Sequence, residues 1–270
     1  MTTTHEYALE RSQLEYERLA LQGEVLKPMT RRLFEEAGIG PGMRVVDLGS
    51  GAGDVCLLLA EMVGPSGRVI GLEVDDEANK FAAERARREG FNNIRFLHLD
   101  VAHYVAGSPL DAVVGRCILM YQPDPAAALG HLVKYLRKGG TAAFMEPWFL
   151  PPGGPDTMMK KAGMIIHDTL QRSGAHTDLG PRLHKVFSNA GLPLPHMRLE
   201  SVIDSRDDSP LNDYLARTVA HLLPKTLEYG LVEPGEIDPD VLAKGARAEM
   251  SAAGYATFGP LLTLAWSSKE

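Results

Sequence analysis

Short apolar runs alternate with amphipathic stretches along the first 150 residues. The apolar runs are too short for helices and indicate strands, while apolar residues at helical spacing fill the stretches between them. The predicted strands are Met43–Leu48, Gly67–Val74, Asn93–Asp100, Leu110–Arg116 and Gly140–Trp148, and the predicted helices are Asp54–Val63, Asp76–Gly90 and Pro125–Lys138. Continuous apolar strands that alternate with helices predict an α/β fold with a parallel sheet covered on both faces.

The N-terminal region and the last 120 residues follow other patterns. Tyr7–Ala37 has apolar residues at roughly helical spacing, interrupted by Gly23 and Pro28. After Trp148 comes a loop rich in Pro and Gly, and further helices and strands follow it. The predicted helices are Thr157–Ser173, Leu179–Leu192, 208–230 and Asp238–Gly254, and the predicted strands are Pro195–Ile203 and Tyr255–Ser268.

Composition limits the classes of function. The chain has 270 residues, 44% hydrophobic and 23% charged, and a net charge of −7, which disfavours nucleic acid as a partner. No apolar run approaches the ~20 residues of a membrane span, and the N-terminus lacks the apolar segment of a signal peptide. Cys56 and Cys117 stand in apolar surroundings and are predicted to be small buried side chains. We expect a cytoplasmic protein with no membrane partner, and a homodimer as the default.

A glycine-rich turn follows the first predicted strand. In the sequence VVDLGSGAGD, Asp47 ends the strand and Gly49, Gly51 and Gly53 precede a helix. Glycines let the backbone take strained conformations and let a ligand approach closely. A nicotinamide fingerprint needs a glycine where Asp54 stands, and the Lys of a phosphate-binding P-loop is absent. A tight turn without any ligand is the alternative interpretation.

Two acids end the next predicted strands. Glu73 follows the glycines by about 20 residues, at the place where an acid receives the ribose hydroxyls of an adenosine. Asp100 ends the third strand, where its side chain can accept from an adenine amino group while the Val101 amide serves a ring nitrogen. Each acid alone could be a helix cap or a solvated charge. Together they predict an adenosine site at the carboxyl edge of the sheet.

These segments resemble class I S-adenosylmethionine (SAM)-dependent methyltransferases, and in particular the small-molecule group related to the ubiquinone-biosynthesis C-methyltransferases. The matching segments are VVDLGSGAGD, VIGLEVD, FLHLDVA and LRKGG, within residues 40–149. The resemblance implies a Rossmann-like, mostly parallel sheet of seven strands, whose closing strand runs antiparallel between strands four and five. It also implies an N-terminal helical lid (1–39), a SAM-binding core (40–150), cap insertions with remaining core elements (151–254) and a closing strand (255–270).

The resemblance assigns the cofactor to named residues. Gly49, Ser50, Gly51 and Gly53 would line the methionine and ribose, with Asp47 near the amino group. Glu73 would bind the ribose hydroxyls, Asp100 and Val101 the adenine, and Val74 would also contact the cofactor. Arg116, in the segment after the fourth strand, would contact the donor, pair with Glu146, or bind an acidic group of the acceptor. Tyr16 and Gln22 are the candidates from the lid.

The acceptor side is less defined. Glu146 and Trp148 follow the fifth strand, so Glu146 is a candidate base or a buried hydrogen-bonded carboxylate, and Trp148 and Tyr121 are candidates for acceptor contacts. His167, in a predicted cap helix, is a second candidate base. Metal-dependent relatives carry an acid where Arg116 stands, so we expect no metal.

The sequence therefore predicts methyl transfer from SAM to a small, apolar or aromatic acceptor. Two alternatives stay open. The same fold could catalyse a reaction without methyl transfer, such as a cyclisation, or only bind a ligand. A nicotinamide-dependent oxidoreductase is disfavoured by the missing third glycine.

Overall fold

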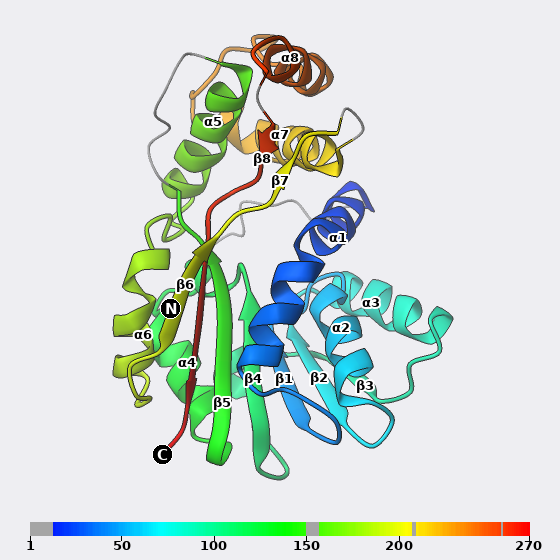
Figure 1. The fold of residues 1–270 in the computed structure, drawn as a ribbon, viewed down its shortest axis with the longest axis vertical. Helices are drawn as coiled ribbons and strands as arrows, with labels where there is room; N and C mark the ends of the chain where they lie inside the picture. The colour runs from blue at the N-terminus through cyan, green and yellow to red at the C-terminus, as the bar shows by residue number, and fades with distance from the viewer. Residues whose placement is uncertain (1–12, 150–156, 207–208, 255) are drawn as a thin grey trace.

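The computed structural model describes residues 13–149, 157–206, 209–254 and 256–270. Seven strands form one sheet in the order β3-β2-β1-β4-β5-β9-β6 (Figure 1). Their bounds are β1 (Arg44–Leu48), β2 (Arg68–Glu73), β3 (Ile94–His98), β4 (Leu110–Arg116), β5 (Leu136–Pro147), β6 (His196–Glu200) and β9 (Leu262–Ser268). The first five strands pair in parallel, which confirms the predicted Rossmann-like α/β fold.

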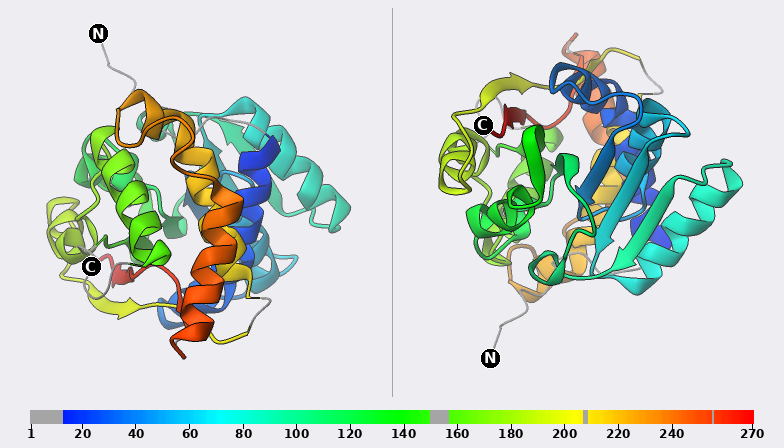
Figure 2. Two further views of the ribbon diagram at one scale, coloured as in Figure 1. Left: turned by 90° about the horizontal axis from the view of Figure 1, so that it is seen from above. Right: turned by 90° about the horizontal axis from the view of Figure 1, so that it is seen from below.

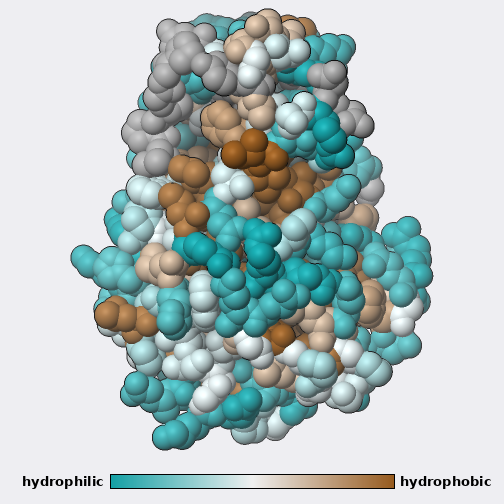
Figure 3. Space-filling model, in the orientation of Figure 1, coloured by the Kyte–Doolittle hydropathy of each residue, from teal (hydrophilic) through white to brown (hydrophobic). Residues whose placement is uncertain are grey.

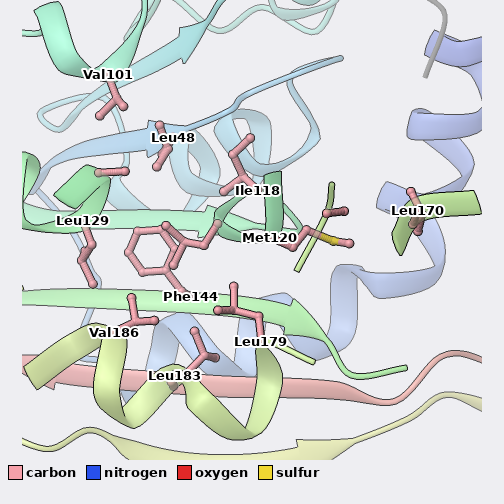
Figure 4. Close-up of a cluster of buried hydrophobic side chains, with 14 of the residues drawn as sticks. Leu48, Val101, Ile118, Met120, Leu129, Phe144, Leu170, Leu179, Leu183 and Val186 are labelled. Carbon is pink, nitrogen blue, oxygen red and sulfur yellow. The ribbon is translucent and has the colours of Figure 1, made fainter. Parts of the chain in front are cut away.

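Helices bury both faces of the sheet because successive apolar side chains of a strand point to opposite faces. On one face, Val113 and Ala142 pack with α4 (Pro125–Val133) and α6 (Leu183–Asn189). Phe144 lies in this cluster among Leu129, Leu183 and Val186 (Figure 4). On the other face, Val114 and Ala143 pack with α1 (Gln13–Glu36) and α2 (Asp54–Val63). The remaining core helix, α3 (Asp76–Arg88), lies against β2 and β3.

The closing strand lies elsewhere than expected. β9 runs antiparallel between β5 and β6, and the expected position between the fourth and fifth strands is wrong. β4 and β5 pair directly, with Ala112 opposite Thr141 and Arg116 opposite Met145, so no strand can enter between them. β9 instead takes the other edge of β5, from Thr141↔Ser268 to Pro147↔Leu262.

Several predicted boundaries were also wrong. α4 ends at Val133, and the segment predicted to complete it begins β5 at Leu136. The segment Tyr255–Ser268 is divided into β8 (Thr257–Phe258) and β9, with Gly259 and Pro260 between them. Proline has no N–H to donate to a sheet, which explains the division. Tyr255 itself lies outside the described residues, as do residues 150–156 of the predicted loop.

The N-terminal helix passes through both predicted interruptions. α1 continues across Gly23 and Pro28 to Glu36. Gly23 lies so close to α2 that a Cβ there would be 2.4 Å from the Asp54 side chain. This glycine therefore permits close helix packing instead of ending the helix. Residues 7–12 of the predicted helix lie outside the described part of the chain.

Three helices and a two-stranded ribbon form a cap above the carboxyl ends of the strands (Figure 1). They are α5 (Met158–Arg172), α7 (Pro210–Glu228), α8 (Pro239–Ala252) and the ribbon of β7 (Ile203–Asp204) with β8. α7 packs on α1, α5 and α8, and the view from above shows α8 lying over α7, with α5 and α1 on either side (Figure 2). The side chains of Thr157, Ser209 and Asp238 cap the first turns of the three cap helices.

An apolar patch marks the ribbon at the junction of cap and core. Figure 3 shows it over β7 and β8, where Ile203 and Phe258 are 71% and 57% exposed. Within the described residues, no helix combines the length and the apolar character needed to cross a bilayer.

Candidate active site

The glycine loop between β1 and α2 has the strained backbone that its sequence predicts. Gly49, Gly51 and Gly53 have φ values of 68°, 49° and 87°, in the left-handed region that favours glycine. The amides of Gly49 and Ser50 both donate to the carbonyl of Leu72, at 2.8 and 3.0 Å. The loop is thereby fixed against the end of β2.

The predicted ribose-binding acid lies beside this loop. Glu73 accepts from the amides of Gly51 and Asp75, both at 3.0 Å. The next residue, Val74, follows β2 and is 45% exposed, although it is apolar. Asp100 lies at the end of the neighbouring strand, is exposed, and accepts from the Ala102 amide at 2.8 Å. The two acids therefore share one edge of the sheet, as predicted.

Two predicted cofactor residues have buried side chains. Val101 packs in the core cluster that Figure 4 shows, so only its backbone is available to a ligand. Asp47 is 1% exposed, and its Oδ2 accepts from the Cys56 thiol at 3.2 Å. Its Oδ1 is buried with no hydrogen bond among the described residues. Burial raises the pKa of Asp47 to about 7, although the Cys56 hydrogen bond lowers it.

Tyr16 anchors α1 to the adenosine edge. Its hydroxyl donates to Asp75 Oδ2 at 3.1 Å, and its ring stacks on Phe81 with 5.0 Å between ring centroids. Asp75 in turn caps α3, because its side chain accepts from the Glu77 amide. The lid candidate thus fastens the helix across the edge where Glu73 lies.

A cavity of about 710 Å³ extends from the glycine loop into the cap. Its walls come from α1, the loop after β1, the ends of β4 and β5, and helices α5, α7 and α8. The predicted residues that line it are Gln22, Gly49, Ser50, Gly51, Arg116, Tyr121 and Trp148. Most other lining residues are apolar, among them Leu26, Ile166, Leu170, Leu211 and Leu222. This is the usual composition of a small-molecule site.

Comparison with known proteins gives the family. A family model described as a methyltransferase domain matches residues 39–191, more than half of the chain. The chain belongs to this methyltransferase domain family. The match covers β1 to β5 with the glycine loop and both acids at the sheet edge.

Curated relatives resemble parts of this methyltransferase domain. An arsenite methyltransferase of Halobacterium salinarum is 32% identical over 124 residues, which is 46% of this chain and 32% of the relative. An aklanonic acid methyltransferase of a Streptomyces species is 32% identical over 145 residues, 53% of this chain and 64% of the relative. The chain therefore matches between a third and two thirds of the length of these relatives. The YcgJ protein of Bacillus subtilis shares the fold, with a TM-score of 0.57, 16% identity, and coverage of 92% and 99% of the two chains.

The residues at the glycine loop fit SAM, the cofactor of class I methyltransferases. Ser50 borders the cavity, and its hydroxyl is buried with no hydrogen bond inside the described ranges. The carboxylate of Glu73 contacts the amide of Gly51, which also borders the cavity. Buried polar groups normally have hydrogen-bond partners. The Ser50 hydroxyl and the nearby Glu73 carboxylate could therefore bind the polar methionine and ribose groups of the cofactor.

Glu146 does not reach the cavity. It is fully buried, and its carboxylate accepts from the amides of Ile118, Leu119 and Met120 at 3.1, 2.9 and 3.3 Å. Burial raises its pKa to about 7, while the three amides lower it. The structure favours the second interpretation of this residue: a buried carboxylate that holds the segment after β4 in place. It is a positioning residue in this geometry.

His167 also lies off the cavity wall. α5 turns Gly163, Ile166 and Leu170 toward the cavity, and these residues share one helix face. His167 is not among the residues that line the cavity: its ring lies behind the lining residue Phe149, with 6.2 Å between ring centroids, its Nδ1 lies 2.7 Å from Asp168 Oδ1, and its Nε2 lies 3.4 Å from Thr177 Oγ1. The proposed base is therefore not among the groups that a molecule in the cavity would meet.

Sequence reasoning missed four polar groups of the cavity wall. Arg18 and Tyr214 line it from α1 and α7, Lys160 lines it from α5, and Cys117 lines it directly after β4. Arg18 and Gln22 are one helical turn apart, a spacing that places both on one face and could have revealed Arg18. Cys117 was predicted as a buried apolar side chain. Among the described residues it is the only non-glycine with a positive φ, at 54°.

Proposed function

We propose that this protein transfers a methyl group from SAM to a small, largely apolar or aromatic acceptor held between core and cap. One observation carries the proposal: a single cavity borders the glycine loop at one end and the apolar faces of α5 and α7 at the other. A molecule in the cap half would lie next to a cofactor at the loop. We also propose that the protein is related to the ubiquinone-biosynthesis C-methyltransferase group, which its motifs resemble.

The chain's own groups would hold the cofactor at the sheet edge. Glu73 would receive the ribose hydroxyls, Asp100 the adenine amino group, and the exposed Val74 the face of the base. Ser50 and Gly51 would meet the methionine part. Bound SAM supplies a methyl group on a sulfonium, and its loss leaves a neutral thioether. The protein therefore has no departing anion to stabilise.

Catalysis would rest on position and on the exclusion of water. The cap and α1 close over the sheet edge, and an enclosed cavity keeps donor and acceptor aligned. Asp54 is the one carboxylate among the lining residues that the structure describes, and it is paired with Arg85 at 3.0 Å. We therefore propose an acceptor that is nucleophilic or ionised without a protein base. Residues 1–39 would act as the lid, and the cap within 151–254 would form the acceptor wall.

Arsenite is a poor candidate for the acceptor. Arsenic(III) is a soft ion that binds thiolates, in keeping with the preference of soft ligands for soft metals. Cys117 is the one thiol among the described lining residues, because Cys56 is buried against Asp47. The walls favour an organic acceptor.

The test has two arms. Calorimetry with S-adenosylhomocysteine (SAH) measures binding at the cofactor site, with NADH as the control for the oxidoreductase alternative. Incubation with methyl-labelled SAM and a set of aromatic and polyketide-like acceptors measures label transfer and SAH release. Binding of SAH with labelled product supports the proposal. Acceptor conversion without label would instead indicate a reaction without methyl transfer, and absence of SAH binding would overturn the cofactor assignment.

A further inference from the structure

The cavity wall includes the buried side chain of Arg18, and one nitrogen of its guanidinium makes no hydrogen bond to a described residue. Arg18 is 4% exposed and lines the cavity from α1. Its Nε and Nη2 both donate to the carboxylate of Glu15 at 2.6 Å. Nη1 makes no hydrogen bond in the described part of the chain. Because hydrogen bonds from a charged donor are strong, a ligand in the cavity that accepts from Nη1 would be stabilised.

The carboxylate of Glu15 that pairs with Arg18 also meets a side chain from the cap. His221 of α7 approaches the same carboxylate, with Nδ1 3.2 Å from Glu15 Oε2. Glu15 therefore serves groups from two helices and fixes the direction of the Arg18 side chain. The fork toward Glu15 leaves Nη1 as the part of the guanidinium available to the cavity.

A second donor, half-buried, lines the same cavity from the cap. The hydroxyl of Tyr214 accepts from Gln22 Nε2 at 3.0 Å, so its own proton is left for another acceptor. No described residue accepts that proton. Burial raises the pKa of Tyr214, although the charge of Arg18 acts to lower it, so the phenol keeps its proton at neutral pH. Gln22 lies one helical turn after Arg18 on α1, so its hydrogen bond holds the Tyr214 hydroxyl close to Arg18.

The charges that line the cavity favour an anion. Arg18, which is paired with Glu15, and Arg116 are cationic residues of the lining, whereas Asp54 is the one carboxylate of the described lining and is engaged by Arg85. Among the described residues, the guanidinium of Arg116 donates to the hydroxyl of Thr30, at 3.3 Å, and to no carboxylate. A positive potential in a water-poor cavity attracts negatively charged ligands.

We propose that Arg18 Nη1 and the Tyr214 hydroxyl together bind an oxyanion of the methyl acceptor. The acceptor is then an aromatic or similarly apolar molecule that carries a carboxylate or an ionised phenol. The two donors fix the orientation of the acceptor between α1 and α7. An acceptor without an acidic group would bind less tightly. This inference rests on the proposed function, and it names the substrate class of the same site.

The experiment compares matched pairs of probes. Calorimetry with SAH-saturated protein at pH 8 uses 2-naphthoic acid and anthraquinone-2-carboxylic acid against their methyl esters. A second arm uses 2-hydroxyanthraquinone, whose hydroxyl is largely ionised at this pH, against its methyl ether, which distinguishes a phenolic oxyanion from a carboxylate. We expect the acid of at least one pair to bind ten times more tightly than its neutral partner, or better.

Two variants then locate the preference. Tyr214→Phe removes one donor and keeps the ring, and it should reduce the preference for the acid about three- to tenfold. Arg18→Met, made together with Glu15→Gln so that no carboxylate is left buried alone, should abolish the preference. Arg217→Met and Tyr135→Phe, which lie outside the cavity wall, serve as matched controls and should retain it.

The outcomes are separable from the proposed function. SAH binding measured in every variant reports the cofactor site and the fold, and it should stay within threefold of the unmodified protein. Equal binding of acids and neutral partners, no binding of any acid, or a preference that survives both variants would overturn the oxyanion site. Labelled transfer to neutral acceptors alone would leave methyl transfer standing and refute the acidic substrate class.

Discussion

A single carboxylate fixes the loop after β4, which contributes Tyr121 to the cavity wall. Glu146 accepts from three successive amides of this loop, which follows Arg116 and Cys117. The residue type and its place at the end of a strand were visible in the sequence. Its partners were not, because they are backbone groups some 26 to 28 residues away along the chain.

Glu146→Gln should change the pH dependence of stability. Its pKa lies near 7 in the folded protein against 4.5 in an unfolded chain, so the folded state holds the proton more tightly. The stability that this group contributes at low pH is lost as the pH rises through about 7. Between pH 5 and 8 the free energy of unfolding should fall in the unmodified protein relative to the variant by up to ~3 kcal/mol. Urea denaturation at both pH values measures this.

The exposed Glu61→Gln serves as the control and should follow the unmodified protein. A constant difference between the Glu146→Gln variant and the unmodified protein across this range would contradict the assigned proton.

Residue patterns located the cofactor edge better than the acceptor wall. The glycines, Glu73 and Asp100 are adjacent to strands that can be recognised in the chain, and parallel strands bring their carboxyl ends together. Arg18 and Tyr214 are about 200 residues apart and meet only through the packing of α1 on α7. Which side chains of α5 line the cavity is likewise a tertiary property, so the role of His167 stays a prediction.

At the scale of elements, the turn between β1 and α2 depends on glycine for two different reasons. Gly49 has a positive φ, and a Cβ there would lie 2.3 Å from Ile118 Cδ1. Gly38 has a similar φ of 77° but has no atom within 4 Å of the same position. Comparing substitutions at Gly49 and Gly38 therefore distinguishes the cost of a strained backbone from the cost of a steric clash.

Gly49→Ala should therefore cost more than Gly38→Ala. Both pay about 1–2 kcal/mol for the left-handed backbone. Gly49→Ala adds ~1–3 kcal/mol for displacing Ile118, and it should weaken SAH binding at least tenfold, whereas Gly38→Ala should leave binding unchanged. Chemical denaturation and calorimetry on the two variants measure both quantities. Equal costs would mean that Ile118 moves freely and that the loop is not held as described.

The pattern of apolar residues predicted which segments form strands. It did not predict the full order of the strands in the sheet. The buried runs of β1 and β4 lie where their apolar residues indicate. The location of β9 depends on which edge of β5 is free to pair, and this cannot be read from the local sequence of either strand. α4 was extended too far because LRKGG continues directly from an apolar helical pattern, whereas pairing with β4 draws Leu136 into β5.

At the scale of the molecule, a cofactor bridging the edges of several strands should stabilise the whole fold. SAH at 100 times its Kd should add about 2.7 kcal/mol and raise Tm by about 5 °C or more for a chain of this size. NADH should produce no rise. Glu73→Ala should remove most of the SAH effect, because its carboxylate lies at the glycine loop.

Glu77→Ala, which removes an exposed acid from the start of α3, provides the control and should keep the SAH effect. Differential scanning calorimetry reports all four measurements. An unchanged rise in the Glu73→Ala variant would place the ligand away from the predicted ribose site.

The position of β9 in the sheet affects how the chain can fold during its synthesis. β5 ends at Pro147, and the strand that completes its hydrogen bonds begins at Leu262, more than a hundred residues later. As the chain leaves the ribosome, one edge of β5 stays open while the cap is being made, and an open edge invites pairing with other chains. Nascent chains of this protein should therefore need chaperone protection until β9 emerges.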